Sequence, residues 1–426
     1  MKETLNKIAA YNLWNGNVLP TGHQRPEYTS RLSSFTGNRL VKVLTGQRRA
    51  GKSYIMRQLA MQLVESGVDC HNILFINREL SVFNFLQTGD DLDALIKAYR
   101  NEIATDGKIY IFIDEVQDII GWERTVNSLS QDYTFEAEVF LSGSNSRLLS
   151  GELSTLLSGR YIGMNVYPFS YSEYQEVWKL KKGRESFLKY LKDGGLPELI
   201  NLPDTEVKQR YVEGLRDSIM LKDIVRRYAI KDVALLENLF SYLVNNAANM
   251  VSVTGIVNFI KGRGSKASYE TVAAYIEYMQ EAFLLHKSVR YKISGKELLG
   301  GNFKIYPNDQ AYHNYLFPTA GYGRGYALEG IVYMTLLRKG YEVNTGVLHN
   351  GEVDFVAKSA RNILYIQVAY SVEDQTTAER EYCAFKGIKG EGEKLLITMD
   401  EETFPTRDGV RHLAAWDLED YLHKVQ

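Results

Sequence analysis

The feature that most constrains this chain is a short loop between a β-rich run and a helical pattern near the N-terminus. Residues 40–45 read LVKVLT, residues 46–53 read GQRRAGKS, and the YIMRQLAMQLVESG that follows carries apolar residues near helical spacing. The two loop glycines permit backbone shapes that wrap a phosphate without side-chain obstruction. Successive N–H groups and the helix N-terminus then point at the anion. The pattern of strand, G-x-x-x-x-G-K-S and helix therefore predicts a phosphate-binding loop.

The sequence of the loop also indicates which ligands it binds. Lys52 can reach the β- and γ-phosphates of a nucleotide, and the hydroxyl of Ser53 can ligate Mg²⁺. ATP and Mg²⁺ are therefore the expected cofactors. The expected nucleotide-binding residues are Gly46, Gln47, Arg48, Arg49, Ala50, Gly51, Lys52, Ser53 and Tyr54.

A second motif, which is acidic, lies downstream of the loop. Residues 108–116 read KIYIFIDEV, an apolar strand that ends in Asp114 and Glu115. Buried parallel strands have this composition, and their carboxyl ends face the ligand crevice. We expect Asp114 to hold Mg²⁺ through a water, so that Ser53 and Asp114 form the metal site, and Glu115 to polarise the attacking water. An acidic strand end alone is common in α/β proteins, and the preceding phosphate loop is what makes this one specific.

Two further positions complete the predicted active site. Residues 138–141 (EVFL) form a strand followed by SGSN, so Ser144 or Asn145 would lie beside the γ-phosphate; a simple polar turn is the alternative. Arg160 precedes the strand-like YIGMNVYP and could face a neighbouring subunit's nucleotide as an arginine finger. A surface or ion-paired arginine is the alternative there, and Arg147 is a weaker competitor. The predicted catalytic residues are Lys52, Asp114, Glu115, Asn145 and Arg160.

Four segments carry motifs more particular than the phosphate loop alone. They read GQRRAGKS, IYIFIDEVQDIIGWE, VFLSGSNSRLLSGELSTLLSGR and YPFSYSEY. Together they resemble the bacterial and archaeal AAA+-type P-loop ATPases that carry a C-terminal domain of unknown function. The resemblance covers almost the whole chain and implies a parallel sheet in the order 5-1-4-3-2 with a small helical lid. Residues 193–198 (DGGLPE) resemble the lid turn of that family, and no second-sensor arginine is assigned.

The middle of the chain resembles a winged helix-turn-helix. Residues 251–283 read as helix, polar turn and helix, with Ser268 as the cap of the second helix, and two strand-like segments follow. In DNA-binding versions the second helix enters the major groove. Here that helix displays tyrosines and glutamates, and the cations Lys261, Arg263 and Lys266 lie in the turn. We therefore favour a structural or protein-contact role over DNA binding.

The C-terminal third has an αβββαβ-like order that resembles the PD-(D/E)XK nuclease fold. That chemistry needs an acid on one strand and an acid-x-lysine on the next, which together hold Mg²⁺ and orient a water. Asp354 fills the first place, and Glu329 could assist from the helix at residues 326–338. The second place holds Gln367, a weaker neutral ligand, and Ala369, which cannot replace a lysine. We expect a retained fold used for recognition or assembly. The expected strands are residues 342–345, 351–356, 363–368 and 393–398.

The length of 426 residues suggests two or three domains. The expected class is α/β: an AAA+-like P-loop ATPase sheet, a helical and winged-helix region, and a C-terminal α/β nuclease-like domain. The expected boundaries are 1–168 for the ATPase core, 169–245 for the lid and connecting helices, 246–312 for the winged helix-turn-helix and 313–426 for the nuclease-like domain.

Composition limits the partners. Lys and Arg total 50 against 52 for Asp and Glu, a net charge of −2, so no global positive field indicates a nucleic-acid binder. The two cysteines, Cys70 and Cys383, suit a reducing cytosol. No apolar run approaches the ~20 residues of a spanning helix, and the N-terminus lacks an apolar signal core, so a cytoplasmic protein is expected. The 29 tyrosines indicate contact surfaces, and many follow the ATPase core. Among them are Tyr269, Tyr275, Tyr278, Tyr322 and Tyr326.

Two functions follow from these patterns. The first is a Mg²⁺-dependent ATP-binding protein that hydrolyses ATP and couples its nucleotide state to rearrangement or assembly of its C-terminal domains. The alternative is a DNA-binding ATPase, such as a loader, a remodeller or a mobile-element or defence factor; an ATP-regulated nuclease is less favoured. Arg160 as a finger would imply a homo-oligomer, and no membrane partner is expected.

Overall fold

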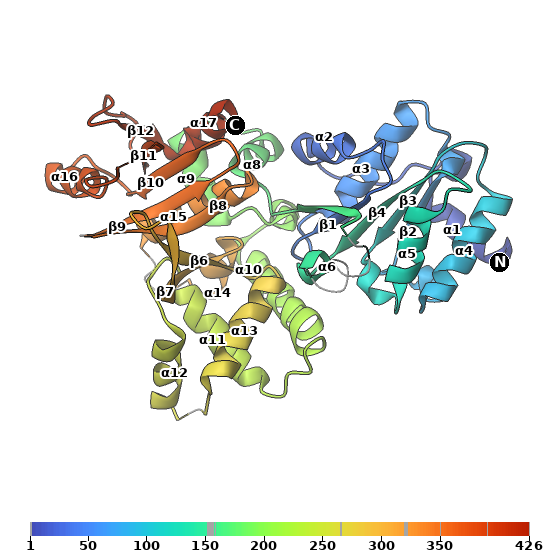
Figure 1. Ribbon diagram of the computed structural model, residues 1–426, viewed down its shortest axis with the longest axis horizontal. Coiled ribbons are helices and arrows are strands. Elements are labelled where there is room, and N and C mark those ends of the chain that lie inside the picture. Colours follow the sequence, from blue (N-terminus) through green and yellow to red (C-terminus); the bar gives the residue numbers. More distant parts are fainter. Residues whose placement is uncertain are drawn as a thin grey trace. The chain divides into compact units, whose positions relative to one another are not determined.

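The computed structural model describes residues 2–150, 157, 159–264, 266–318, 323–349, 351–389 and 391–425. The chain divides into two compact units, Met1–Tyr167 and Pro168–Gln426. Figure 1 labels most of the helices and strands of both units. Part of the LLSGELSTLLSGR run, and Tyr322 among the predicted contact tyrosines, lie outside the described residues.

The first unit is built on a parallel five-stranded sheet in the order β2-β3-β4-β1-β5. This is the 5-1-4-3-2 order that the AAA+ resemblance implies, and it is confirmed. Phe75, Phe112 and Phe140 stack across three neighbouring strands, with ring centroids 5.7 and 4.6 Å apart. The strands are β1 (Val41–Thr45), β2 (Ile73–Asn77), β3 (Ile109–Asp114), β4 (Ala137–Gly143) and β5 (Tyr161–Asn165).

Helices cover both faces of this sheet because alternate strand residues point to opposite sides. Apolar residues of α2 and α3 form one core with one face, and those of α1, α4 and α5 form a second core with the other. The predicted helix after the phosphate loop is α3. The helices are α1 (Lys2–Ile8), α2 (Pro26–Ser34), α3 (Lys52–Glu65), α4 (Gly89–Glu102), α5 (Trp122–Gln131) and α6 (Arg147–Ser150).

A buried ionic group ties two central strands together near their amino ends. Lys42 of β1 donates to Glu138 of β4 over 2.8 Å, and both side chains are at most 1% exposed. Glu138 also pairs with Lys108 and accepts from the backbone N–H of Gly37 at 2.8 Å. The strands that carry the phosphate loop and the SGSN turn are therefore joined by an internal ion pair.

Most helices in the first half of the second unit, those within residues 205–316, share one apolar core. Ser268 caps α13 by accepting from the N–H of Thr271, as predicted, but Tyr275 is buried in this core and Tyr278 stacks on Tyr228 with ring centroids 3.7 Å apart. The helices are α8 (Tyr171–Trp178), α9 (Arg184–Asp193), α10 (Thr205–Ser218), a π-helix at Ile219–Val225, α11 (Val233–Asn245), α12 (Val253–Gly262), α13 (Tyr269–Glu281) and α14 (Ala311–Leu316).

A seven-stranded mixed sheet completes this unit, in the order β12-β11-β10-β9-β8-β6-β7. The two strands predicted as a wing, β6 and β7, form an antiparallel pair, and β6 also pairs with β8, so they extend the C-terminal sheet. The strands are β6 (Leu285–Lys292), β7 (Glu297–Pro307), β8 (Glu342–Leu348), β9 (Gly351–Lys358), β10 (Ile363–Val368), β11 (Glu393–Thr398) and β12 (Val410–Ala414). The remaining helices are α15 (Arg324–Arg338), α16 (Gln375–Cys383) and α17 (Leu418–Val425). Within the described residues, every helix is too short or too polar to cross a membrane.

Candidate functional site

The phosphate loop connects the end of β1 to the start of α3, and its backbone explains its glycines. Gly46 has a φ of 153°, and a Cβ there would lie 2.1 Å from the carbonyl oxygen of Val166. Arg49 and Gly51 adopt φ angles of 64° and 99°, and α3 begins at the next residue. These positive φ angles turn the chain tightly from strand to helix. The loop N–H groups and the N-terminus of α3 thereby form the concave surface expected for an anion.

Lys52 lies inside this loop and is 4% exposed. Its Nζ donates to the carbonyl oxygens of Gly46 at 2.9 Å and Gln47 at 3.1 Å. The same ammonium is 3.5 Å from Oε1 of Glu115, which follows β3. The structure therefore brings the predicted lysine and the predicted acidic strand end together.

Asp114 ends β3 and is 1% exposed. The hydroxyl of Ser142 donates to its Oδ1, whereas Oδ2 is buried with no hydrogen-bond partner among the described residues. Burial and the nearby charge of Glu115 raise the pKa of Asp114, and Ser142, Ser53 and Lys52 oppose that rise. A buried carboxylate oxygen without a donor, beside a serine hydroxyl, suits a hard cation that prefers oxygen ligands. The residues present thus fit the Mg²⁺ ion that the phosphate loop implies.

Glu115 has a left-handed backbone, with φ 56°. Its N–H donates to Oγ of Ser142 at 3.1 Å, and its side chain accepts from the amide of Gln117. Burial opposes ionisation of this carboxyl, but the charges of Lys52 and Arg48 hold its pKa below its usual value. Glu115 is therefore an ionised, oriented acceptor at the carboxyl edge of the sheet. Gln117, two residues beyond the motif, is a contributor that the sequence pattern did not indicate.

Two arginines contact this region in different ways. Arg48 of the loop pairs with Glu79, Nη1 to Oε1, at 2.9 Å. Arg25, absent from the predicted site, is 1% exposed and donates from Nη1 to the carbonyl oxygens of Ala50 at 2.8 Å and Tyr167 at 3.0 Å. It therefore supports the loop from behind. No motif spacing could have indicated it, because it lies before the first strand and reaches the loop only through the fold.

Asn145 and Ser144 follow β4 and are fully buried. Strand β4 lies beside β3 in parallel, with Leu141 opposite Ile113, so both residues lie at the same edge of the sheet as Asp114. Oδ1 of Asn145 accepts from the N–H of Arg147 at 2.7 Å. The predicted sensor position is thus brought to the phosphate-loop edge.

Arg160 lies at the opposite end of the strands, near the amino end of β1. Its carbonyl oxygen accepts from the N–H of Val41 at 2.9 Å, the first residue of β1, whereas the phosphate loop follows the last residue of that strand. A five-residue strand spans about 13–17 Å. The Arg160 side chain is exposed and makes no ion pair with the residues that the structure describes. The fold of this unit does not bring Arg160 to its own phosphate loop.

The predicted lid turn at residues 193–198 lies in the second unit. Its Gly195 donates from N to Oδ2 of Asp309 at 2.8 Å, and a Cβ on Gly194 would lie 2.1 Å from Oδ1 of the same residue. Burial raises the pKa of Asp309 to about 6, against the backbone N–H groups of Ala311 and Gly195 that lower it. Gly194 is therefore required by close contact with the loop that follows β7, and Gly195 by the carbonyl oxygen of Phe169, which would lie 2.2 Å from a Cβ there.

The residues of the predicted nuclease-like site also meet in the second unit. Glu329 of α15 and Asp354 of β9 both contact Lys304 of β7, which the sequence pattern did not indicate. Gln367 of β10 donates to Oε2 of Glu381 at 2.8 Å. Ala369 lies just beyond β10 and is buried.

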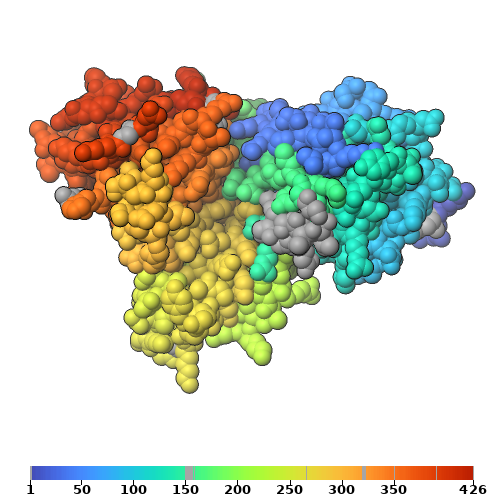
Figure 2. All heavy atoms as spheres, in the orientation of Figure 1, coloured from blue at the N-terminus to red at the C-terminus, as the bar shows by residue number. Residues whose placement is uncertain are grey.

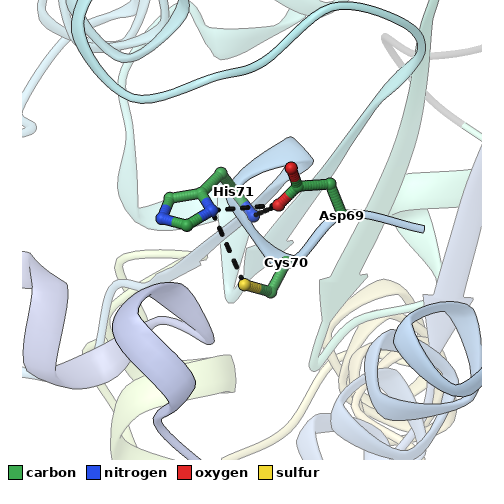
Figure 3. Close-up of side chains that lie close together, drawn as sticks. All are labelled: Asp69, Cys70 and His71. Atoms are coloured by element: carbon green, nitrogen blue, oxygen red, sulfur yellow. Dashed lines mark hydrogen bonds and ion pairs between the residues drawn. The ribbon is translucent and has the colours of Figure 1, made fainter. Parts of the chain in front are cut away.

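A separate group of possible metal ligands is explained by helix capping. Asp69, Cys70 and His71 are consecutive, and Figure 3 shows their side chains gathered at one turn. Oδ1 of Asp69 accepts from the backbone N and from Nδ1 of His71, each at 2.9 Å, and Oδ2 accepts from Thr105 at 3.1 Å. Asp69 thereby caps the 3₁₀ helix Cys70–Asn72 and links it to the loop before β3.

Comparison with known proteins agrees with this geometry. Residues 38–175 match the family model described as an AAA domain, and residues 184–321 match a domain of unknown function, DUF8612. The chain is 33% identical over 378 residues to an uncharacterized protein of Haemophilus influenzae, covering 88% of this chain and 92% of that protein. The chain belongs to the same family as that protein. It is also 29% identical to the uncharacterized protein MJ1544 of Methanocaldococcus jannaschii, over 88% of this chain and 86% of that protein.

A solved structure, the Walker-type ATPase PABY2304 of Pyrococcus abyssi, has a TM-score of 0.48 and 16% identity, covering 69% of this chain and 95% of that one. The AAA-domain match spans the phosphate loop, the acidic strand end and all five strands of the first sheet. The prediction of an α/β chain with a P-loop, AAA-type ATP-binding domain is therefore confirmed. The second matched model assigns no activity to the residues that follow.

Proposed function

We propose that this protein is a Mg²⁺-dependent ATPase whose nucleotide state controls the rearrangement or assembly of the regions that follow its ATPase core. One observation carries the proposal. Lys52, the orphaned Oδ2 of Asp114 and the ionised Glu115 converge at the end of β3, beside Ser53 at the start of α3. Phosphoryl transfer depends on positioning and charge stabilisation, and these residues supply both.

Each residue has a distinct role in this proposal. Lys52 leaves the two loop carbonyls and, with the loop N–H groups, neutralises phosphate charge. Ser53 and Asp114 hold Mg²⁺, which when bound neutralises the charge that develops on the phosphate oxygens. Glu115 accepts a hydrogen bond from the attacking water, and its lowered pKa keeps it ionised for that task. Asn145, fixed by the N–H of Arg147, reports the presence of the γ-phosphate.

Turnover assays on matched variants test the assignment. Lys52→Ala should lower the ATPase rate by roughly 10²–10³-fold because a preorganised charge is removed. Glu115→Gln should lower kcat by roughly 10²–10⁴-fold and retain ATP binding. Lys97→Ala and Glu136→Gln replace exposed residues of the same types and serve as controls. Wild-type turnover by the Lys52→Ala protein would refute the proposal.

Arg160 enters the proposal as a residue that acts on a neighbouring subunit. It is exposed at the end of the strands opposite its own phosphate loop. Any nucleotide that it contacts would therefore be bound to a second copy of the chain. We expect a non-hydrolysable ATP analogue to promote self-association in sedimentation, and Arg160→Ala to lower the ATPase rate at protein concentrations where the assembly forms. Arg124→Ala, on the exposed side of α5, is the matched control. A persistent monomer with an unchanged Arg160→Ala rate would remove this part of the proposal.

The alternative, a DNA-acting ATPase, rests on the turn between α12 and α13. This turn forms a projecting tip of the second unit (Figure 2), and its surface includes a recess lined by Lys261, Gly264, Lys266, Ala267 and Ser268.

Exposed lysines at such a tip could contact phosphates, although α13 presents Tyr269, Glu270 and Glu277 rather than cations. Fluorescence anisotropy with duplex DNA at several salt concentrations tests this reading. Binding through phosphates must weaken steeply with salt. If a Lys261→Ala/Lys266→Ala protein bound DNA as tightly as the wild type, the turn would be excluded as the DNA-binding site.

A further inference from the structure

The second unit contains a buried ionic cluster, formed by Lys304, Glu329 and Asp354. Nζ of Lys304 lies 2.8 Å from Oε1 of Glu329 and 3.3 Å from Oδ1 of Asp354. The three side chains are 10%, 8% and 16% exposed. They come from strand β7, helix α15 and strand β9, so only the folded second unit brings them together. The two acids are those at which the nuclease-like pattern predicts a divalent metal.

Protein donors already occupy three of the four carboxylate oxygens of these two acids. Oε1 of Glu329 accepts from Lys304 and also from the hydroxyl of Tyr306 at 2.7 Å. Oδ1 of Asp354 accepts from Lys304, and Oδ2 accepts from the N–H of Val368 at 2.9 Å. A divalent ion would have to displace a buried ammonium from both carboxylates and leave it unpaired, which is strongly unfavourable.

Gln367, which stands where the pattern expects the second acid, is also held by hydrogen bonds at both ends of its amide. Oε1 of Gln367 accepts from the N–H of Asp354 at 3.2 Å, and its Nε2 donates to Glu381. A neutral amide held at both ends cannot supply the negative charge that a carboxylate would give a metal. The residues present therefore do not fit the divalent ion that the nuclease-like pattern implies.

We propose that the ammonium of Lys304 is the resident cation of this site, taking the place of a divalent metal between Glu329 and Asp354. Burial alone would discharge the lysine, but Asp354 and Glu329 raise its pKa above the usual value, so it stays charged. The centre joins β7, α15 and β9 through a fixed internal charge and needs no metal. Its residues hold the sheet and its covering helix together where a nuclease would perform its chemistry.

A metal-counting experiment on the full chain tests this proposal without altering Lys304. Equilibrium dialysis with Mn²⁺, followed by elemental analysis, compares the wild-type protein with Asp354→Asn. Any Mn²⁺ bound at the phosphate loop is common to both proteins and cancels. We expect the same number of bound ions per chain in both. One ion fewer in Asp354→Asn would show that a metal occupies the site despite Lys304, and would overturn the proposal.

Removing the ammonium provides the second measurement. Lys304→Ala should expose two acids and create a new site, which Tb³⁺ luminescence detects because Tyr306 lies beside Glu329 as a sensitiser. We expect one additional bound Tb³⁺ per chain in Lys304→Ala, lost again in Lys304→Ala/Glu329→Gln. Lys287→Ala, an exposed lysine on the neighbouring β6, is the control and should gain nothing. A folded Lys304→Ala protein that gains no site would refute the role of the ammonium. If that variant does not fold, the Mn²⁺ comparison decides alone.

Discussion

Replacing Glu138 with glutamine should destabilise the ATPase unit strongly while leaving every phosphate-loop residue in place. The carboxylate accepts from Lys42 at 2.8 Å and from the N–H of Gly37 at 2.8 Å, and it pairs with Lys108. Glutamine retains the volume and one carbonyl oxygen that can accept a hydrogen bond, but it loses the negative charge that compensates the fully buried Lys42 ammonium. The other described acceptor for that ammonium is the carbonyl oxygen of Asn38, at 3.2 Å. Leaving one member of a buried pair uncompensated costs roughly 3–5 kcal/mol.

That cost predicts a measurable shift in melting temperature. For a domain of this size, each kcal/mol changes Tm by about 2–4 °C, so the Glu138→Gln protein should melt roughly 6–20 °C lower. Differential scanning calorimetry can follow the transition of the ATPase unit. Glu136→Gln, an exposed residue just before the same strand, is the matched control and should shift Tm by little. A Glu138→Gln protein within 1–2 °C of wild type would refute the assigned cost.

The pH dependence gives an independent check. Burial disfavours the charged form of Glu138, but Lys108, Lys42 and the N–H of Gly37 hold its pKa below the ordinary 4.5. A lowered folded-state pKa means that the stabilisation is fully present above the unfolded value of 4.5 and is lost as the pH falls through the folded-state value. The Tm difference between wild type and Glu138→Gln should therefore be constant near neutrality and shrink below pH 4.5. A difference that grew in acid would contradict this reasoning.

Three further substitutions test close contacts and a cap. Gly46→Ala places a Cβ 2.1 Å from the carbonyl oxygen of Val166, which should strain the loop backbone by about 1–3 kcal/mol. ATP binding measured by titration calorimetry should weaken roughly 5–150-fold, and the circular dichroism spectrum should not change. The Cβ of Gly195→Ala would lie 2.2 Å from the carbonyl oxygen of Phe169, so this substitution should lower the Tm of the second unit. Gly214→Ala on α10 is the control: its Cβ would have no neighbour within 4 Å, and the Tm should stay the same or rise. Ser268→Ala removes the cap of α13 and should cost about 1 kcal/mol in chemical denaturation; an unchanged midpoint would show that the cap contributes nothing.

The sequence predicted most of the local structure of both units. The phosphate loop, the strand that ends at Asp114 and the cap at Ser268 were each recognisable because a few neighbouring residues encode them. The order of the first sheet followed from the family resemblance. In the second unit, the helix at Glu329 and the strands around Asp354 were equally local and were found within a few residues of their bounds. Alternation and capping are short-range signals, so a single chain is enough to read them.

The tertiary structure decided which residues meet. Arg25 reaches the phosphate loop only because the folded chain brings it there, and Arg160 is separated from its own loop by the length of a strand. Tyr275 looks exposed on a helical pattern but is buried by neighbouring helices.

Lys304 is the clearest case. The sequence by itself indicated a nuclease-like pattern in which Ala369 stands where a lysine is expected, and so predicted that the metal chemistry is incomplete. It could not show that a lysine from β7, 25 residues before Glu329 and 50 before Asp354, fills the space between those acids. Register and strand order in a sheet set such distances, and they depend on pairings between segments far apart in the chain.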